Sequence, residues 1–290
     1  MANEAWTVLK LLGWMKKHFT ARNVDSPRLA AEVLLAHVLG CQRIELYARH
    51  DKEPTEQQRA TLRDMVKRAA EHVPVAYLVG KKEFYSLAFK VTADVLIPRP
   101  ETEGVVGEAL AIIERLGRAA KVWDVCTGSG CVAVAIASQS PEAAVLATDI
   151  CEAALAVAAE NARAHAVGDR VRVARADLFT PLPAEGADLA TFDVVTANPP
   201  YVAEGDVVGE SVKHEPRGAL YAGADGLDVI RRLVPMAAGV LARGGGLVME
   251  FGRGQADAVR ELIVATGAFT EPEIRRDQAH IERIAVTMKK

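Results

Sequence analysis

From residue 121 onward the chain alternates between strand-like apolar runs and helical patterns, and this alternation constrains the fold more than any other feature. Strands that alternate with helices form a mostly parallel, doubly wound α/β sheet. In such sheets, ligands bind beyond the carboxyl ends of the strands. The expected strands are residues 121–126, 144–150, 170–174, 192–197, 247–251, 271–275 and 283–288, and the expected helices are 131–138, 152–164, 227–242 and 255–265.

The chain before this alternation has a different pattern. Residues up to about 75 show only helical periodicity, with a predicted helix start at Ser26 and Pro27 and a capping box formed by Thr55 and Gln58. Aromatic and apolar residues then alternate with period two, which indicates a hairpin. We therefore predict a helical domain at residues 1–75, a β-hairpin linker at 76–101 and an α/β domain at 102–290 that begins with a helix at 102–116.

A glycine-containing loop follows the first predicted strand of the α/β domain. Gly128 and Gly130 let the backbone turn tightly and approach a ligand. Asp149 ends the next predicted strand, where its carboxylate suits the two hydroxyl groups of a ribose. The pattern fits two cofactors, NAD and S-adenosylmethionine, because Asp149 also has the spacing of the dinucleotide fingerprint.

Asp124, which lies just before this loop, discriminates between the two cofactors. A carboxylate there would repel the pyrophosphate of a dinucleotide. S-adenosylmethionine instead carries a positive sulfonium and an ammonium group, which favours it. Asp177 is expected near the adenine amine, with Leu178 against the ring. The predicted cofactor-binding residues are Asp124, Cys126, Thr127, Gly128, Ser129, Gly130, Asp149, Asp177, Leu178 and Asn198.

The tetrapeptide Asn198-Pro199-Pro200-Tyr201 directly follows another predicted strand. Its prolines fix the backbone and lack N–H donors, so the loop offers mainly acceptors. The side-chain oxygen of Asn198 and the carbonyl of Pro199 can together accept both hydrogens of an NH₂ group, while Tyr201 supplies a flat wall. These four residues are the predicted catalytic residues, and they indicate methyl transfer to an NH₂ group.

The sequence resembles the HemK/PrmC family of release-factor glutamine methyltransferases along nearly its whole length. The similar segments are residues 26–29, 84–87, 96–103, the glycine loop, 198–201, 214–216 and 282–283. The resemblance implies a class I methyltransferase sheet of seven strands and a small N-terminal helical domain that binds the protein substrate. That substrate would be the Gly-Gly-Gln loop of class I peptide-chain release factors, methylated on the glutamine amide.

By position, the resemblance assigns the cofactor loop to residues 126–130 and the amide-holding loop to 198–201. Cys126 stands where the family usually has glycine, and its side chain is expected to point into the core. Leu178 stands where some relatives carry a larger ring. Arg99, Pro100 and Glu101 are expected to bind substrate, although Arg99 and Glu101 could instead pair with each other.

Composition excludes several classes of protein. The four cysteines form no CxxC pair, so no metal site is expected, and no apolar run is long enough to span a membrane. The N-terminus lacks a signal-peptide pattern, which favours a cytoplasmic enzyme. The enzyme is also expected to be monomeric. A net charge of −3 disfavours direct binding of nucleic acid. The alternatives that stay open are a DNA or RNA adenine amino-group methyltransferase and a non-catalytic adenosyl- or dinucleotide-binding module.

Overall fold

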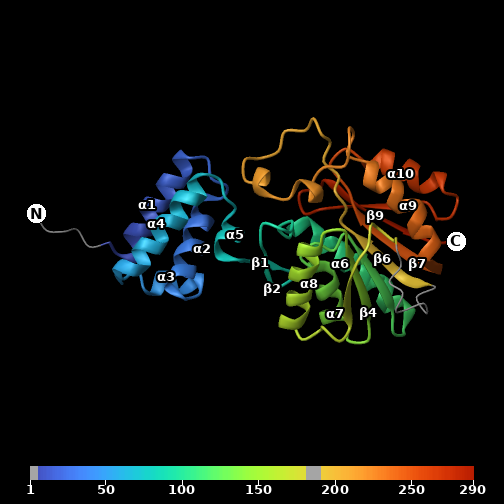
Figure 1. Cartoon of the computed structure of the whole chain (residues 1–290), viewed down its shortest axis with the longest axis horizontal. Coiled ribbons are helices and arrows are strands. Elements are labelled where there is room, and N and C mark those ends of the chain that lie inside the picture. The colour runs from blue at the N-terminus through green and yellow to red at the C-terminus, as the bar shows by residue number, and fades with distance from the viewer. Residues whose placement is uncertain (1–5, 181–190) are drawn as a thin grey trace, which may run out of the picture. The chain divides into compact units, whose positions relative to one another are not determined.

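The structure, a computed structural model, describes residues 6–180 and 191–290, and the chain forms two compact units (Figure 1). The helical unit contains the chain as far as Lys81 together with Val208–His214. The catalytic unit contains Lys82–Val207 and Glu215–Lys290. This division differs from the predicted limit of the helical domain at residue 75, and the domain limits stay predictions. A further short helix begins at that residue and packs against the preceding helices.

The helical unit is a bundle around its own apolar core. Its helices are α1 (Val8–Ala21), α2 (Pro27–Leu39), α3 (Arg43–Ala48), α4 (Glu56–Ala70) and α5 (Val75–Val79). Large side chains that are buried at its centre include Met15, Phe19, Leu34, Leu35 and Leu46. The segment Val208–His214 is bound to this unit in part through Ser211, whose hydroxyl donates to Asp25 at 2.7 Å.

The two predicted helix starts in this unit have different outcomes. The capping box is confirmed, since the Thr55 side chain accepts from the Gln58 backbone and the Gln58 side chain accepts from the Thr55 backbone. Ser26 precedes α2 as expected but has a left-handed φ of 46° and makes no capping hydrogen bond. Of the predicted helix start, the proline at the first helical position is confirmed.

The catalytic unit contains a seven-stranded sheet in the order β5-β4-β3-β6-β7-β9-β8. The strands from β5 to β7 are parallel, and β9 is antiparallel to both β7 and β8. This is the doubly wound arrangement that the alternation predicts. The strands are β3 (Lys121–Val125), β4 (Ala144–Asp149), β5 (Val171–Arg175), β6 (Phe192–Ala197), β7 (Leu241–Glu250), β8 (Glu273–Arg276) and β9 (Glu282–Met288).

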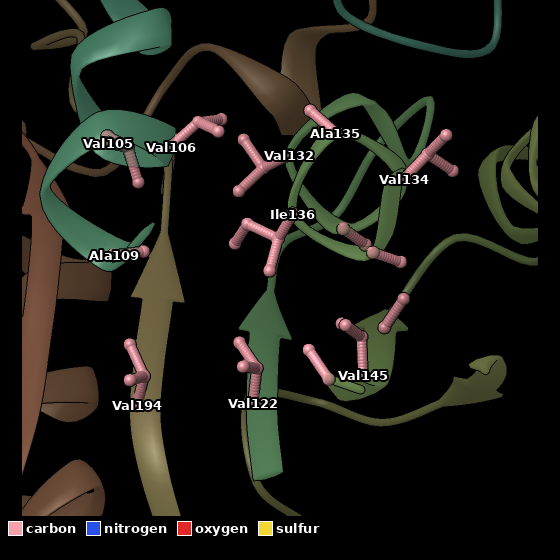
Figure 2. Close-up of a cluster of buried hydrophobic side chains, with 14 of the residues drawn as sticks. Val105, Val106, Ala109, Val122, Val132, Val134, Ala135, Ile136, Val145 and Val194 are labelled. Carbon is pink, nitrogen blue, oxygen red and sulfur yellow. The ribbon is translucent and has the colours of Figure 1, made fainter. Parts of the chain in front are cut away.

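Two apolar clusters cover the sheet. In one, side chains of α6 and α7 face the valines Val122, Val145 and Val194 of three neighbouring strands (Figure 2). In the other, side chains of α9 and α10 pack around Trp123 and Phe192. The helices are α6 (Glu103–Leu116), α7 (Cys131–Gln139), α8 (Glu152–Ala164), α9 (Asp228–Val240) and α10 (Ala256–Ala265), with short 3-10 turns η1 (Pro100–Thr102), η2 (Val212–His214) and η3 (Arg217–Ala219).

Two sequence predictions about strands are corrected by the structure. The hairpin is shorter than expected, with β1 (Lys81–Phe84) and β2 (Leu87–Lys90) as its strands. The run of glycines at 244–246 lies inside β7 and does not precede it, so α9 ends earlier than predicted. A Cβ at Gly245 would lie 2.9 Å from the Asp193 carbonyl oxygen, and one at Gly246 would lie 2.5 Å from Ile112. Gly245 and Gly246 therefore allow a close approach of strand and helix, and the pairing of β7 with β6 is irregular between Leu241 and Gly246.

Candidate active site

The register of the parallel strands brings the predicted site residues to one edge of the sheet. Val125 pairs with Thr148 on one side and with Ala197 on the other. Ala197 in turn pairs with Met249 of β7. The residues that follow these four positions therefore emerge side by side. They are the glycine loop, Asp149, Asn198 and Glu250, of which Glu250 was not predicted.

The glycine loop and Asp149 are joined by backbone hydrogen bonds. The Thr127 N–H donates to the Thr148 carbonyl at 2.9 Å, and the Gly128 N–H donates to the Asp149 carboxylate at 2.9 Å. Gly128 and Gly130 both have positive φ, and a Cβ on Gly130 would lie 3.0 Å from Ala158 of α8. Burial raises the pKa of Asp149, and the backbone donors partly offset this. The carboxylate is thus fixed at the mouth of the loop.

Asp124 lies beneath this loop, and its neighbours modify the sequence interpretation. It is buried, and its two carboxylate oxygens accept from the Thr127 hydroxyl at 2.5 Å and the Thr196 hydroxyl at 2.7 Å. Burial raises its pKa to about 6, against the effect of these donors. Asp124 therefore anchors the loop, and a direct contact of its carboxylate with the cofactor stays a prediction.

The remaining loop residue of interest is Cys126, which has a φ of 58°. Glycine adopts this left-handed conformation without strain, which gives a physical reason for the family's preference. The Cys126 side chain packs against the apolar cluster around Trp123, as expected, and burial raises the pKa of its thiol. The thiol is therefore poorly suited to act as a nucleophile.

The two residues expected at the adenine ring have partners within the protein. Asp177 accepts from Arg232 of α9 at 2.7 Å, and both side chains are about half exposed. Leu178 is 5% exposed and belongs to the apolar cluster that contains Trp123 and Phe179. Leu178 thus contributes to the core, and adenine contacts for both residues stay predictions.

Asn198 has the arrangement expected of an acceptor for an NH₂ group. Its side-chain nitrogen donates to the Thr102 hydroxyl at 3.0 Å. Its side-chain oxygen is buried and has no hydrogen-bond partner among the described residues. Tyr201 donates from its hydroxyl to Glu250 at 2.9 Å, and its backbone is held by Leu220 and Gln255. Burial and the neighbouring Glu250 raise the pKa of Tyr201, so the phenol keeps its proton.

Sequence reasoning missed three residues around this site. Thr102 and Glu250 are buried and hydrogen-bonded to each other at 2.6 Å. Asn161 of α8 donates to the carbonyls of Ser129 and Lys90, at 2.8 and 3.0 Å, and so fixes the glycine loop. Glu250 carried a usable signal, because it is an acid near the end of a predicted strand, as Asp149 is. Asn161 carried a weaker one, a polar residue on an otherwise apolar helix face.

Arg99 does not pair with Glu101, the partner that the sequence analysis suggested. Arg99 forms an ion pair with the buried carboxylate of Glu215, which also accepts from the Ile97 N–H at 3.0 Å. Glu101 lies in η1, next to Thr102. The ion pair links the Arg99–Glu101 segment to residues 214–216, which the sequence had singled out, and a role of Arg99, Pro100 and Glu101 in substrate binding stays a prediction.

Two further features are absent from the described residues. Within residues 6–180 and 191–290, no group of three or more histidine, cysteine, aspartate or glutamate side chains could hold a metal ion. No helix in the same ranges is long and apolar enough to cross a membrane.

The fold and the site define the class of protein. The catalytic domain of human METTL16, solved with an RNA hairpin, superposes with a TM-score of 0.57 at 16% identity, over 76% of this chain and 81% of that one. A structure of the human METTL16 N-terminal domain in complex with SAH gives a TM-score of 0.52 at 16% identity, over 71% and 76%. The predicted class I methyltransferase fold is confirmed, and the chain is an S-adenosylmethionine-dependent methyltransferase.

Sequence comparisons specify the family. The PrmC N-terminal domain matches residues 10–80, and the methyltransferase small domain matches residues 108–218. A release factor glutamine methyltransferase of Rhodopirellula baltica is 43% identical, over 98% of this chain and 97% of that protein. One of Geobacter sulfurreducens is 39% identical over 97% and 96%. The chain belongs to the release factor glutamine methyltransferase family, as the sequence analysis expected.

Proposed function

We propose that this enzyme transfers a methyl group from S-adenosylmethionine to the side-chain amide nitrogen of the glutamine in the Gly-Gly-Gln motif of class I peptide-chain release factors. The observation that carries this proposal is the buried side-chain oxygen of Asn198, which has no hydrogen-bond partner among the described residues. Buried polar atoms almost always have a partner, and one without is costly unless a ligand supplies it. An NH₂ group supplies the donor that this oxygen lacks.

The residues around the glycine loop fit S-adenosylmethionine. Asp149 stands beside the loop with a half-buried carboxylate, suited to the ribose hydroxyls. A Cβ on Gly128 would meet nothing within 4 Å, so the backbone there is open to a ligand. When bound, the cofactor supplies an activated methyl group on a positive sulfur. Asp124 and Asn161 keep the loop in shape beneath it.

The chemistry proposed for the amide depends on positioning. An amide nitrogen is a weak nucleophile because its lone pair is delocalised into the carbonyl. With one hydrogen on the Asn198 oxygen and the other on the Pro199 carbonyl, the lone pair would point toward the methyl group. Positioning of this kind can supply ~7–11 kcal/mol. The methylated nitrogen is acidic enough to lose a proton to water, so the residues at the site need supply no strong base.

The helical unit supports a protein partner. It exposes large apolar side chains whose exposed fractions exceed 40%, and the rings of Trp6 and Trp14 pack edge to face with their centroids 6.4 Å apart. These side chains are Trp6, Leu9, Trp14, Leu29, Ile44 and Tyr47. We assign this unit to recognition of the release factor, with Arg99, Pro100 and Glu101 contacting the substrate near the reacting glutamine. The enzyme is proposed to act as a monomer in the cytoplasm, where release factors function.

The proposal is tested by incubating the purified enzyme with labelled S-adenosylmethionine and a recombinant release factor. We expect label in the factor and none when the glutamine after the two glycines is replaced by alanine. Parallel reactions with DNA and RNA test the adenine methyltransferase alternative, and calorimetry with NAD and S-adenosylmethionine tests the binding-module alternative. Label in nucleic acid, or binding of NAD without response to S-adenosylmethionine, would overturn the proposal.

A further inference from the structure

We propose that Thr102 and Glu250 are positioning residues that fix which way the side-chain amide of Asn198 faces. An asparagine amide has an oxygen that accepts and a nitrogen that donates, and the two ends have nearly the same shape. The proposed reaction works with the oxygen toward the substrate. This inference rests on the proposed function, because it explains how one end of Asn198 is selected to hold an NH₂ group.

The selection follows from a directed chain of hydrogen bonds. Asn198 donates from its nitrogen to the Thr102 hydroxyl oxygen at 3.0 Å, and Thr102 donates from that hydroxyl to Glu250 at 2.6 Å. A carboxylate accepts and cannot donate, so it takes the single hydrogen of Thr102. The Thr102 oxygen is then left only as an acceptor. It can pair with the nitrogen of Asn198 and cannot pair with its oxygen.

Other contacts keep Glu250 in its place in this chain. Its second oxygen accepts from the Tyr201 hydroxyl at 2.9 Å. Glu250 and Thr102 are 1% and 2% exposed, so water does not compete for these bonds. Of the charged groups at longer range, Arg283 lowers the pKa of Glu250 and Glu101 raises it. The carboxylate thus connects the loop at 198–201, η1 and β7 through hydroxyl donors.

The chain also determines which substrates can be accepted. Reversal of the Asn198 amide would turn its nitrogen toward the substrate, where two donors would face each other. With the oxygen outward, the site accepts an NH₂ group and disfavours a carboxylate or an ester oxygen. We infer that selectivity for glutamine over glutamate is set in part by Thr102 and Glu250, which the substrate need not touch.

The first test compares Thr102→Val with Thr102→Ser. Valine has the shape of threonine without the hydroxyl, whereas serine keeps the hydroxyl. We expect Thr102→Val to lower kcat for the release factor on the order of 10- to 100-fold, while the Kd for S-adenosylmethionine and the KM for the factor change less than about threefold. Thr102→Ser should recover kcat to within about threefold. Equal kcat values for wild type and Thr102→Val would overturn the inference.

Glu250 is tested with the pair Glu250→Ala and Glu250→Gln. Alanine removes the acceptor, which frees the Thr102 hydrogen for the Asn198 oxygen. Glutamine retains an acceptor for Thr102. We expect kcat to fall on the order of 10- to 100-fold in Glu250→Ala and clearly less in Glu250→Gln. Equal losses in both variants, with equal losses of thermal stability, would show a merely structural role.

A spectroscopic measurement distinguishes failure of this inference from failure of the proposed function. The side-chain NH₂ resonances of Asn198, assigned by their loss in Asn198→Ala, can be followed in ¹⁵N-labelled enzyme without any substrate. In the wild type they should be shifted and protected from exchange with solvent, and in Thr102→Val both properties should be lost. Unprotected wild-type resonances would overturn the inference even if the enzyme methylates release factors. Protected resonances in an enzyme that leaves release factors unmethylated would overturn the proposed function alone.

Discussion

Glu32 in the helical unit and Glu250 in the catalytic unit are both almost fully buried, at 4% and 1% exposed, but their partners differ in kind. Glu32 accepts from Tyr47 at 2.5 Å and from Arg28 and Arg43 at 2.8 Å each. Burial alone would raise its pKa, but these donors outweigh it and lower the pKa to about 2. Burial raises the pKa of Glu250, and its hydroxyl donors offset this only in part.

This difference distinguishes a carboxylate that is buried to hold the fold together from one that is buried to serve the site. The ion pair of Glu32 with Arg43 joins α2 to α3, the one with Arg28 lies within α2, and both neutralise the charge locally. The hydroxyl groups of Thr102 and Tyr201 donate to Glu250 without neutralising its charge, and Thr102 in turn accepts from the side-chain nitrogen of Asn198. A protein tolerates the cost of an incompletely neutralised buried group mainly where function needs it. The predictions below test this contrast, from the largest expected effect to the smallest.

The largest effect is expected at Asn198, the last residue in the series of hydrogen bonds that joins Glu250, Thr102 and Asn198. Asn198→Ala should lower turnover on the order of 100-fold or more, because the oxygen acts on the amide in the transition state. Its Kd for S-adenosylmethionine should stay within about threefold of wild type. Steady-state kinetics together with calorimetry check this. Near wild-type turnover would show that Glu250 orients a group with no catalytic role.

Asp149→Ala should instead weaken the binding of S-adenosylmethionine. The loss of charge-assisted hydrogen bonds, ~1.5–3 kcal/mol each, corresponds to a Kd for S-adenosylmethionine raised about 10- to 150-fold. Calorimetry with the cofactor or its demethylated product measures this. Asn161→Asp provides a comparison, because it alters the other contact that holds the glycine loop, the hydrogen bond to the Ser129 carbonyl. An unchanged Kd in Asp149→Ala would remove the assigned ribose contact.

Glu32→Gln tests the structural side of the contrast. It should destabilise the helical unit by about 1–3 kcal/mol at pH 7, a moderate cost because Arg28 and Arg43 are largely exposed and can be rehydrated. Denaturant unfolding measures this loss, and the Kd for S-adenosylmethionine should not change. Glu56→Gln, at an exposed ion pair with Arg59, is the matched control, expected to have no measurable effect.

The pH dependence of stability sharpens the same comparison. Because folding lowers the pKa of Glu32, its contribution is complete above the unfolded value of 4.5 and is lost as the pH falls toward about 2. Wild type should therefore lose more stability than Glu32→Gln over this range. Parallel curves for the two proteins would contradict the ion-pair account.

The smallest effect is expected at Cys126. Because its side chain packs against the core, Cys126→Gly should change the Kd for S-adenosylmethionine by less than about threefold. Two effects on the stability of this variant oppose each other: glycine relieves the strain of the left-handed backbone, and the loss of the side chain removes core contacts. A gain in affinity of tenfold or more would show that the thiol crowds the cofactor.

The parts of the site that sequence alone predicted are those determined by strand ends. Alternating strands and helices imply parallel strands, so Asp149 and Asn198 had to emerge at the same edge as the glycine loop. Glu250 was missed because its role depends on β7 lying beside β6, a neighbour relation that the order of elements in the sequence does not reveal. Thr102 was missed because it reaches the sheet from a segment that precedes it.

Helix and strand boundaries failed where packing overrides local preference. The glycines at 244–246 have turn-like composition, yet they lie in β7, at an irregular part of its pairing with β6. At Gly245 and Gly246 a larger side chain would collide with β6 and α6. The charge of Asp124 led to its prediction as a cofactor contact, which stays a prediction, but the sequence did not reveal that its oxygens accept from two threonine hydroxyls. Thr127 is three residues away, but Thr196 comes from β6, a distant part of the chain that the local sequence does not reveal.

The central claim is that Asn198 holds an amide NH₂ while its nitrogen is methylated. The most direct test is acid hydrolysis of a release factor labelled by this enzyme, because an N-methylated amide releases methylamine on hydrolysis. We predict that the label is recovered as methylamine and that peptide mapping places it on the glutamine after the two glycines. Label recovered as methanol, on another residue, or in a factor that lacks this glutamine would contradict the account.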